Sequence, residues 1–201
     1  MKIFDTLRNA KTELEFSDKV RIYLCGVTVY DDAHIGHART IIVFDVLRRF
    51  LESQNIPVEF IQNFTDVDDK IIDRAQQEKI SPLELAAKYT KNYFDDFDGL
   101  NIKRATIYPK ATEHIEDMQN LISNLVDKKY AYVTKNGVYF SVSKFTEYGK
   151  LSKKKIDDLV SGARVAVDEE KNNPIDFALW KFSNSEPSWD SPWGKGRPGW
   201  H

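Results

Sequence analysis

The sequence predicts an α/β fold in which a parallel sheet comes first and an inserted subdomain of mixed helix and strand follows. Apolar and β-branched residues mark strands near residues 21–28 and 58–64, and the segment between them has helical spacing. Strand, helix and strand within about 45 residues form a βαβ unit, with a right-handed crossover and parallel strands that are buried on both faces. Further along, Asn136-Gly137 between two apolar runs predicts a tight β-hairpin.

The first helix is expected to begin near His37 and to end before Pro57. Apolar residues recur along it at three- and four-residue steps, which defines one buried face, and polar residues occupy the other. The buried face comprises Ile41, Phe44, Leu47 and Leu51, and the other face carries Arg48, Arg49 and Glu52.

Capping signals predict where the later helices begin. Thr65 or Asp66 is the candidate N-cap of the second helix. The run Ser81-Pro82-Leu83-Glu84 predicts the start of the third, because a capping serine is followed by proline and then by glutamate, and this helix should end before Gly99. Thr112 is the candidate cap of a further long helix.

Changes in character along the chain divide it into three parts. Residues 1–108 carry the βαβ alternation, residues 109–195 contain the hairpin and form the inserted subdomain, and residues 196–201 return to the first domain. Phe4 and Leu7 are expected to anchor the N-terminus onto the core. Half of a doubly wound sheet is expected to leave an edge and apolar faces exposed.

Composition excludes several classes of protein. The chain has 201 residues, 41% of them hydrophobic, and a net charge of −2, so no overall basic field indicates nucleic-acid binding. The single cysteine, Cys25, excludes an internal disulfide and suits a reducing compartment. With neither a signal peptide nor an apolar run of about 20 residues, a cytoplasmic protein is expected.

The segment between the first strand and the first helix holds two of the four histidines, His34 and His37, with Gly36 between them. Imidazoles and backbone N–H groups at a helix N-terminus suit a nucleotide phosphate, which Gly36 would allow to approach closely. The pair alone would also be consistent with a helix cap, with surface polarity or with half of a metal site.

Other candidates have a structural and a functional interpretation. Cys25 is consistent with a small buried apolar residue. Asp66, Asp68 and Asp69 suit either a divalent metal or helix capping, and Thr65 is the better candidate to face a pocket. Tryptophans 180, 189, 193 and 200 form either an aromatic core or a loop over a pocket. Neither a P-loop nor a dinucleotide fingerprint is present.

The segment 23–40, with His34-Ile35-Gly36-His37 near its centre, resembles the signature of the cysteinyl-tRNA synthetases, a family of class I aminoacyl-tRNA synthetases. The likeness covers essentially the whole chain. It continues through Phe44-Asp-Val-Leu-Arg-Arg, Asn63-Phe-Thr-Asp-Val-Asp-Asp-Lys, residues 161–165, Asp176-Phe-Ala-Leu-Trp-Lys and residues 187–201.

This resemblance implies a Rossmann-like first half in residues 1–108 and a connective-peptide subdomain in the insertion. It implies that ATP, with Mg²⁺, activates cysteine to cysteinyl-adenylate and that cysteine then passes to tRNA(Cys). His34, Gly36 and His37 would bind ATP, and the two imidazoles would be catalytic.

Gly26, Thr65 and Trp200 would form the pocket for the substrate cysteine. Cys25 would be one ligand of a Zn²⁺ ion that holds the substrate thiol. The family's other zinc ligands and its lysine-containing loop lie beyond residue 201, so this chain alone is expected to be inactive.

Two alternatives stay open. A related class of ligase passes activated cysteine to an aminosugar; there the residue after the motif threonine tends to be proline, whereas here Val29 follows Thr28. The chain would otherwise be a non-catalytic fragment that binds a nucleotide or a partner. The sequence does not predict an oligomeric state.

Overall fold

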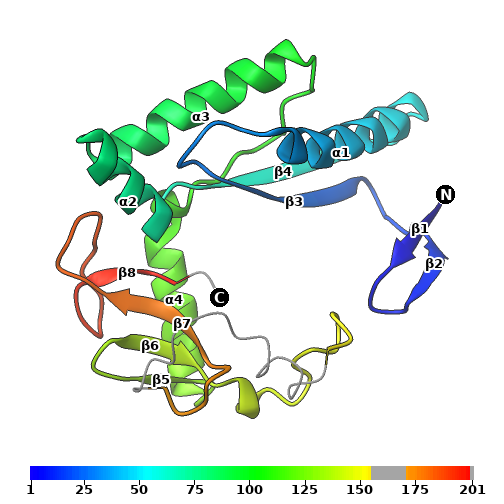
Figure 1. Cartoon of the computed structure of the whole chain (residues 1–201). Coiled ribbons are helices and arrows are strands. Elements are labelled where there is room, and N and C mark those ends of the chain that lie inside the picture. Colours follow the sequence, from blue (N-terminus) through cyan, green and yellow to red (C-terminus); the bar gives the residue numbers. More distant parts are fainter. Residues whose placement is uncertain (155–170, 200–201) are drawn as a thin grey trace. The chain divides into compact units, whose positions relative to one another are not determined.

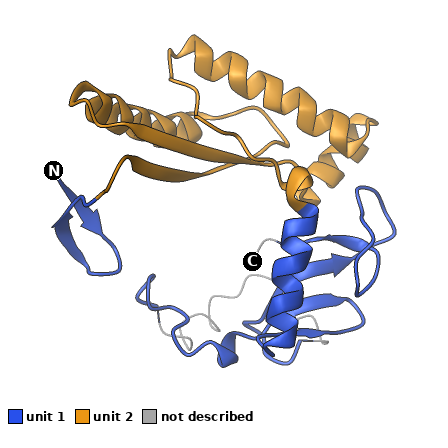
Figure 2. Cartoon of the chain, turned by 180° about the vertical axis from the view of Figure 1, so that it is seen from behind, with its two compact units in different colours: residues 1–15, 115–201 blue, residues 16–114 orange. Residues whose placement is uncertain are grey.

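A computed structural model of the protein describes residues 1–154 and 171–199. The chain divides into two compact units (Figure 2). Residues 16–114 form what we call the parallel-sheet unit, and residues 1–15 with 115–201 form the antiparallel unit. The predicted division at residues 108, 195 and 201 stays a prediction.

The parallel-sheet unit contains the predicted βαβ arrangement (Figure 1). Strands β3 and β4 pair in parallel, from Val20 opposite Val58 to Thr28 opposite Thr65. On the side of β4 away from β3, Ile107 and Lys110 form isolated parallel bridges with Ile61 and Phe64. Among the described residues β3 therefore pairs on one side only and is an edge strand. The elements are β3 (Val20–Thr28), α1 (Ile35–Ser53), β4 (Val58–Thr65), α2 (Asp69–Glu78), α3 (Pro82–Gly99) and the short helix η1 (Ala111–His114).

Helices α1 and α3 lie on the same side of the β3–β4 pair, as right-handed crossovers in one direction require (Figure 1). The core lies between them and the strands, and includes Leu24, Ile41, Phe60, Leu85 and Tyr93. The opposite face of β3 carries exposed side chains of residues 21, 23 and 25. The prediction of strands buried on both faces is therefore wrong for β3, because only one face has helices against it in the described residues.

Helix α1 begins two residues earlier than predicted, because His34 caps it. Ile41 and Leu51 are buried as expected. Arg48 was placed on the exposed face but is 7% exposed. Its guanidinium donates to Glu52 and to the Arg104 carbonyl oxygen, at 3.0 and 2.6 Å, so the charge is paired where it is buried.

The caps of the next two helices differ in how well they were predicted. The N-cap of α2 is Asp68, whose carboxylate accepts from the Lys70 N–H, and not Thr65 or Asp66. Strand β4 continues through Thr65, which moves the start of the helix along the chain. The Ser81–Glu84 capping box of α3 is confirmed, although that helix includes Gly99 instead of ending before it.

The described part of the antiparallel unit contains two sheets. The predicted hairpin around Asn136-Gly137 is confirmed as β5 and β6, within a sheet of order β5-β6-β7-β8. Thr112 lies inside η1 and does not cap the long helix α4 that follows. The elements are β1 (Lys2–Asp5), β2 (Ala10–Glu13), α4 (Ile115–Asp127), β5 (Ala131–Val133), β6 (Gly137–Phe140), η2 (Val142–Lys144), β7 (Phe177–Phe182) and β8 (Gly196–Pro198).

The N-terminal residues form the β1–β2 hairpin, which the sequence did not predict. Phe4 and Leu7 are 57% and 46% exposed, so their expected role as core anchors is wrong. In the rest of the unit, Trp180 is fully buried and packs edge-on against Trp193 at 6.4 Å, as the aromatic-core interpretation predicts. Within the described ranges, no helix has the length and apolar character needed to cross a membrane.

Candidate functional site

The turn from β3 into α1 holds the two histidines in one hydrogen-bonded unit. The His34 Nδ1 atom accepts from the Gly36 N–H at 3.0 Å, which caps the helix. The His37 Nδ1 atom accepts from the His34 N–H at 3.3 Å, so each imidazole satisfies a backbone donor of the first turn. The two rings stack with centroids 3.9 Å apart and planes 22° apart. The capping interpretation is thus confirmed.

These hydrogen bonds determine which ring nitrogen carries the proton. Since Nδ1 is an acceptor in both His34 and His37, a neutral ring holds its one proton on Nε2. Burial, and secondarily the neighbouring His34, lower the pKa of His37 below the usual histidine value. His37 is therefore neutral at pH 7, and its Nε2–H remains a hydrogen-bond donor.

Gly36 and the end of α1 complete a site suited to an anion. A Cβ at Gly36 would lie 2.7 Å from His34 Cε1, so glycine leaves room for the ring in its stacked position. The first turn of α1 contains no acidic residue that would neutralise the positive end of the helix dipole. Two imidazole donors and this helix end can together stabilise negative charge on a phosphate.

A second set of residues lies on β3 and β4. Cys25 is exposed, which contradicts its interpretation as a buried apolar residue. At Gly26 a Cβ would lie 1.5 Å from the Asn63 carbonyl oxygen, so only glycine fits. Thr65 is 7% exposed, and its hydroxyl lies 3.5 Å from Asn63 Nδ2.

Thr65 connects the two sets through the backbone. It is the register partner of Thr28, and its carbonyl oxygen accepts from the Val29 N–H at 3.2 Å. The carboxyl ends of both strands therefore meet at one sheet edge, as the βαβ topology predicts. Trp200 lies outside the described residues, and so do residues 161–165, where the sequence resembles the synthetase family.

The aspartates after β4 have structural roles. Asp68 caps α2, and the Asp66 carboxylate accepts from the N–H and the hydroxyl of Thr112, at 3.0 and 2.5 Å. In the described part of the chain no three His, Cys, Asp or Glu side chains form a metal-binding group. For zinc, the accessible thiolate donor of Cys25 fits one ligand position, but the described residues do not make a complete site.

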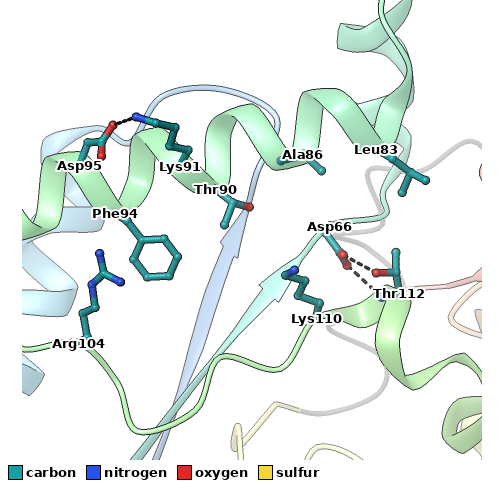
Figure 3. A pocket seen from close by; sticks show the side chains of 11 residues that line it. Asp66, Leu83, Ala86, Thr90, Lys91, Phe94, Asp95, Arg104, Lys110 and Thr112 are labelled. Carbon is teal, nitrogen blue, oxygen red and sulfur yellow. Dashed lines mark hydrogen bonds and ion pairs between the residues drawn. The ribbon is translucent and has the colours of Figure 1, made fainter.

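A cavity of about 550 Å³ lies between α3 and the chain segment after it, with Asp66 at one end (Figure 3). Its three cationic side chains are already paired: Lys91 with Asp95 at 2.5 Å, Arg104 with Asp98 at 2.6 Å, and Lys110 with Glu113 at 3.4 Å. Neither histidine lines it. A charged ligand there would have to displace these pairs, so we assign it no function.

Comparison with known proteins gives the family. The family model of the tRNA synthetases class I (C) catalytic domain matches residues 12–201. The chain belongs to this family. Curated cysteine–tRNA ligases are similar along the whole chain: it is 58% identical to that of Thermodesulfovibrio yellowstonii, and 54% identical to those of Clostridioides difficile and Thermococcus kodakarensis.

The chain spans 43–44% of the length of these relatives. Membership of the class I family agrees with the predicted α/β fold and its parallel strand pair. Sequence reasoning placed the histidines, Cys25 and Thr65 near one edge of the sheet, but it missed Asn63. Its polar side chain is no distinctive signal, because β4 also contains Glu59 and Gln62.

Proposed function

We propose that the protein to which this chain belongs is a cysteine–tRNA ligase, which activates cysteine with ATP and transfers it to tRNA(Cys). The observation that carries the proposal is the stacked, hydrogen-bonded pair His34 and His37 at the N-terminus of α1, in a chain of the class I (C) family. These two residues are the proposed catalytic residues, and with Gly36 they form the proposed ATP site.

In the first step, a carboxylate oxygen of cysteine attacks the α-phosphorus of ATP, and the bond to the β-phosphate oxygen breaks to release pyrophosphate. Negative charge accumulates on the α-phosphate oxygens in the transition state. The Nε2–H donors of His34 and His37 stabilise this charge, since both Nδ1 atoms are occupied by backbone N–H groups.

The proposed pocket for the substrate cysteine comprises Gly26, Thr65 and Trp200. We assign Cys25 as one ligand of Zn²⁺, with the other ligands beyond residue 201. Its exposed thiol supports this assignment, and the described residues contain no further side chains that would complete a metal-binding group with it.

The wider assignments belong to the same proposal. Residues 1–108 are the first half of the catalytic domain, residues 109–195 the connective-peptide insertion, and residues 196–201 the return to the catalytic domain. ATP would bring Mg²⁺ on its phosphates. A single cysteine in the chain suits the reducing cytoplasm, where tRNA is charged.

Cysteine-dependent exchange of pyrophosphate into ATP, measured on the full-length protein, tests the function. His37→Ala should lower the exchange rate about 100-fold or more, since loss of a charge-stabilising donor typically costs that much. His114→Ala is the matched control, because it removes an exposed histidine that lies in η1 and not in the proposed ATP site, and it should stay within about twofold of wild type.

The product of the transfer step distinguishes the two proposed enzymatic functions. A cysteine–tRNA ligase forms cysteinyl-tRNA, whereas the related ligase would attach cysteine to an aminosugar and leave tRNA uncharged. Wild-type protein without cysteine-dependent exchange would overturn the enzymatic proposal and favour a binding fragment. Equal losses in both histidine variants would contradict the role of His37.

A further inference from the structure

We propose that Asn63 is a positioning residue for the substrate-cysteine site. Its side-chain amide holds a bulge in β3 beside Cys25 and orients the hydroxyl of Thr65. The structural part of this inference stands on the geometry of β3 and β4. Its functional part rests on the proposed function, which assigns Thr65 to the cysteine pocket and Cys25 to the adjoining zinc site.

The register of the two strands shifts opposite Asn63. Leu24 pairs with Gln62 and Val27 pairs with Phe64, so two residues of β3 lie opposite one residue of β4. A bulge leaves one strand with an extra residue outside the regular ladder. Here the N–H of that strand at Gly26 donates to the Asn63 side-chain oxygen at 2.8 Å, so a side chain takes the place of a ladder partner.

The same oxygen also anchors the residue on the other flank of Cys25. The Tyr23 hydroxyl donates to Asn63 Oδ1 at 2.9 Å. Tyr23 and Cys25 are two residues apart on one strand and therefore point to the same face of the sheet. One oxygen atom thus accepts hydrogen bonds from the residues on both sides of Cys25, and so holds the segment that carries the thiol.

The orientation of the amide determines that of the Thr65 hydroxyl. The Gly26 N–H requires an acceptor, which places Asn63 Oδ1 toward β3 and Nδ2 toward Thr65. Since the amide NH₂ can only donate, the Thr65 oxygen accepts at 3.5 Å. The hydroxyl hydrogen of Thr65 therefore points away from Asn63 and is available to donate to a ligand.

The first test separates local positioning from general stability and needs no measurement of enzymatic activity. Amide hydrogen exchange followed by NMR should show that Asn63→Ala accelerates exchange of the Gly26 N–H at least about tenfold. Asn63→Asp keeps an oxygen opposite Gly26 and should leave this rate within about threefold. The core amides of Ile22 and Ile41 should change by less than about twofold in both variants.

Unchanged Gly26 exchange in Asn63→Ala would overturn the proposal, because another group would then hold the bulge. Equal acceleration of the Gly26, Ile22 and Ile41 amides would also overturn it, since Asn63 would then contribute only to overall stability. Both outcomes are read without any enzymatic activity, so they are independent of the proposed function.

The second test measures the KM for cysteine and the KM for ATP in pyrophosphate exchange by the full-length protein. Asn63→Ala should raise the KM for cysteine at least about tenfold and leave that for ATP within about twofold, because the proposed ATP site lies at the N-terminus of α1. Asn63→Asp should also raise the KM for cysteine, since a carboxylate makes Thr65 donate toward residue 63. Asn124→Ala, on α4, is the matched control and should change neither constant.

A double-mutant cycle of Asn63→Asp and Thr65→Val shows whether residue 63 affects the KM for cysteine through Thr65 or through a direct effect of its charge. If Asn63 acts by orienting that hydroxyl, adding Asn63→Asp to Thr65→Val should raise the KM for cysteine less than about twofold further. Fully multiplicative effects, or equal changes in both Michaelis constants, would overturn the positioning role. Wild-type protein without any exchange would overturn the proposed function and, with it, the role in the cysteine site, while the exchange rate of Gly26 would still decide the structural part.

Discussion

His37 connects the charge state of one side chain to the stability of a helix end. Its Nδ1 atom accepts from the His34 N–H, and protonation at Nδ1 would remove that acceptor. Burial and the adjacent His34 lower its pKa in the folded protein. The unfolded chain therefore binds a proton more readily than the folded chain does, so stability is lost as the pH falls below about 6.5, the usual pKa of histidine.

We expect the free energy of unfolding to fall between pH 7.5 and pH 5.5, and to fall less in His37→Gln. Glutamine can still accept from the His34 N–H but does not titrate. Urea unfolding of wild type and His37→Gln at both pH values measures how much the free energy of unfolding falls in each protein. Other titrating groups are common to both proteins, so their contribution cancels when the two falls are subtracted. An equal pH dependence in the two proteins would contradict the lowered pKa.

At the same scale, the sequence predicted some site residues and missed another for a physical reason. His34 and His37 were recognisable because their type and spacing at a helix start are distinctive. Asn63 was not, because its role depends on the register between β3 and β4, and the sequence contains no local sign of the bulge. Gly26 was predicted as a pocket residue, yet the structure gives it a packing reason as well.

Helix α1 has apolar side chains on two faces, and only one of them is buried. Ile41 is 4% exposed, whereas Val43, Val46 and Phe50 are 60%, 61% and 49% exposed. Helical spacing in the sequence identified the buried stripe. It did not predict that the second stripe would be exposed, because burial depends on which element lies against a face as well as on the side chain.

The two faces of α1 should respond differently to truncation. Ile41→Ala should lower the free energy of unfolding by about 2–4 kcal/mol, because it removes buried methyl groups and leaves a cavity. Val46→Ala should stay within about 0.5 kcal/mol of wild type or be slightly stabilising, since alanine favours the helix. Urea unfolding followed by far-UV circular dichroism measures both, and similar losses would mean that the second stripe is packed in solution.

At the scale of the whole molecule, the described residues contain two separate hydrophobic cores. One includes Leu85 and Phe64 in the parallel-sheet unit, and the other includes Ile122 and Trp180 in the antiparallel unit. The sequence predicted a change of architecture along the chain, from βαβ to hairpin. It did not predict that residues 1–15 group with residues 115–201, since such long-range grouping leaves no periodic signal.

Because each unit has its own core, we expect that a destabilising substitution in one unit leaves the other unit folded. Trp180, Trp189 and Trp193 lie in the described part of the antiparallel unit, so the fluorescence of these three side chains reports on that unit. Leu85 is fully buried in α3. Leu85→Ala should lower the stability of the parallel-sheet unit by about 2–5 kcal/mol. In urea, the circular dichroism transition should therefore shift to lower concentration or split, while the fluorescence midpoint stays within error of wild type.

Ile122→Ala is the matched variant in the other core, where Ile122 is 5% exposed. It should shift the fluorescence midpoint to lower urea concentration, because its cavity lies in the unit that contains the tryptophans. If Leu85→Ala moved the fluorescence and circular dichroism transitions together, the units would unfold as one cooperative structure. That result would contradict independent folding of the two units.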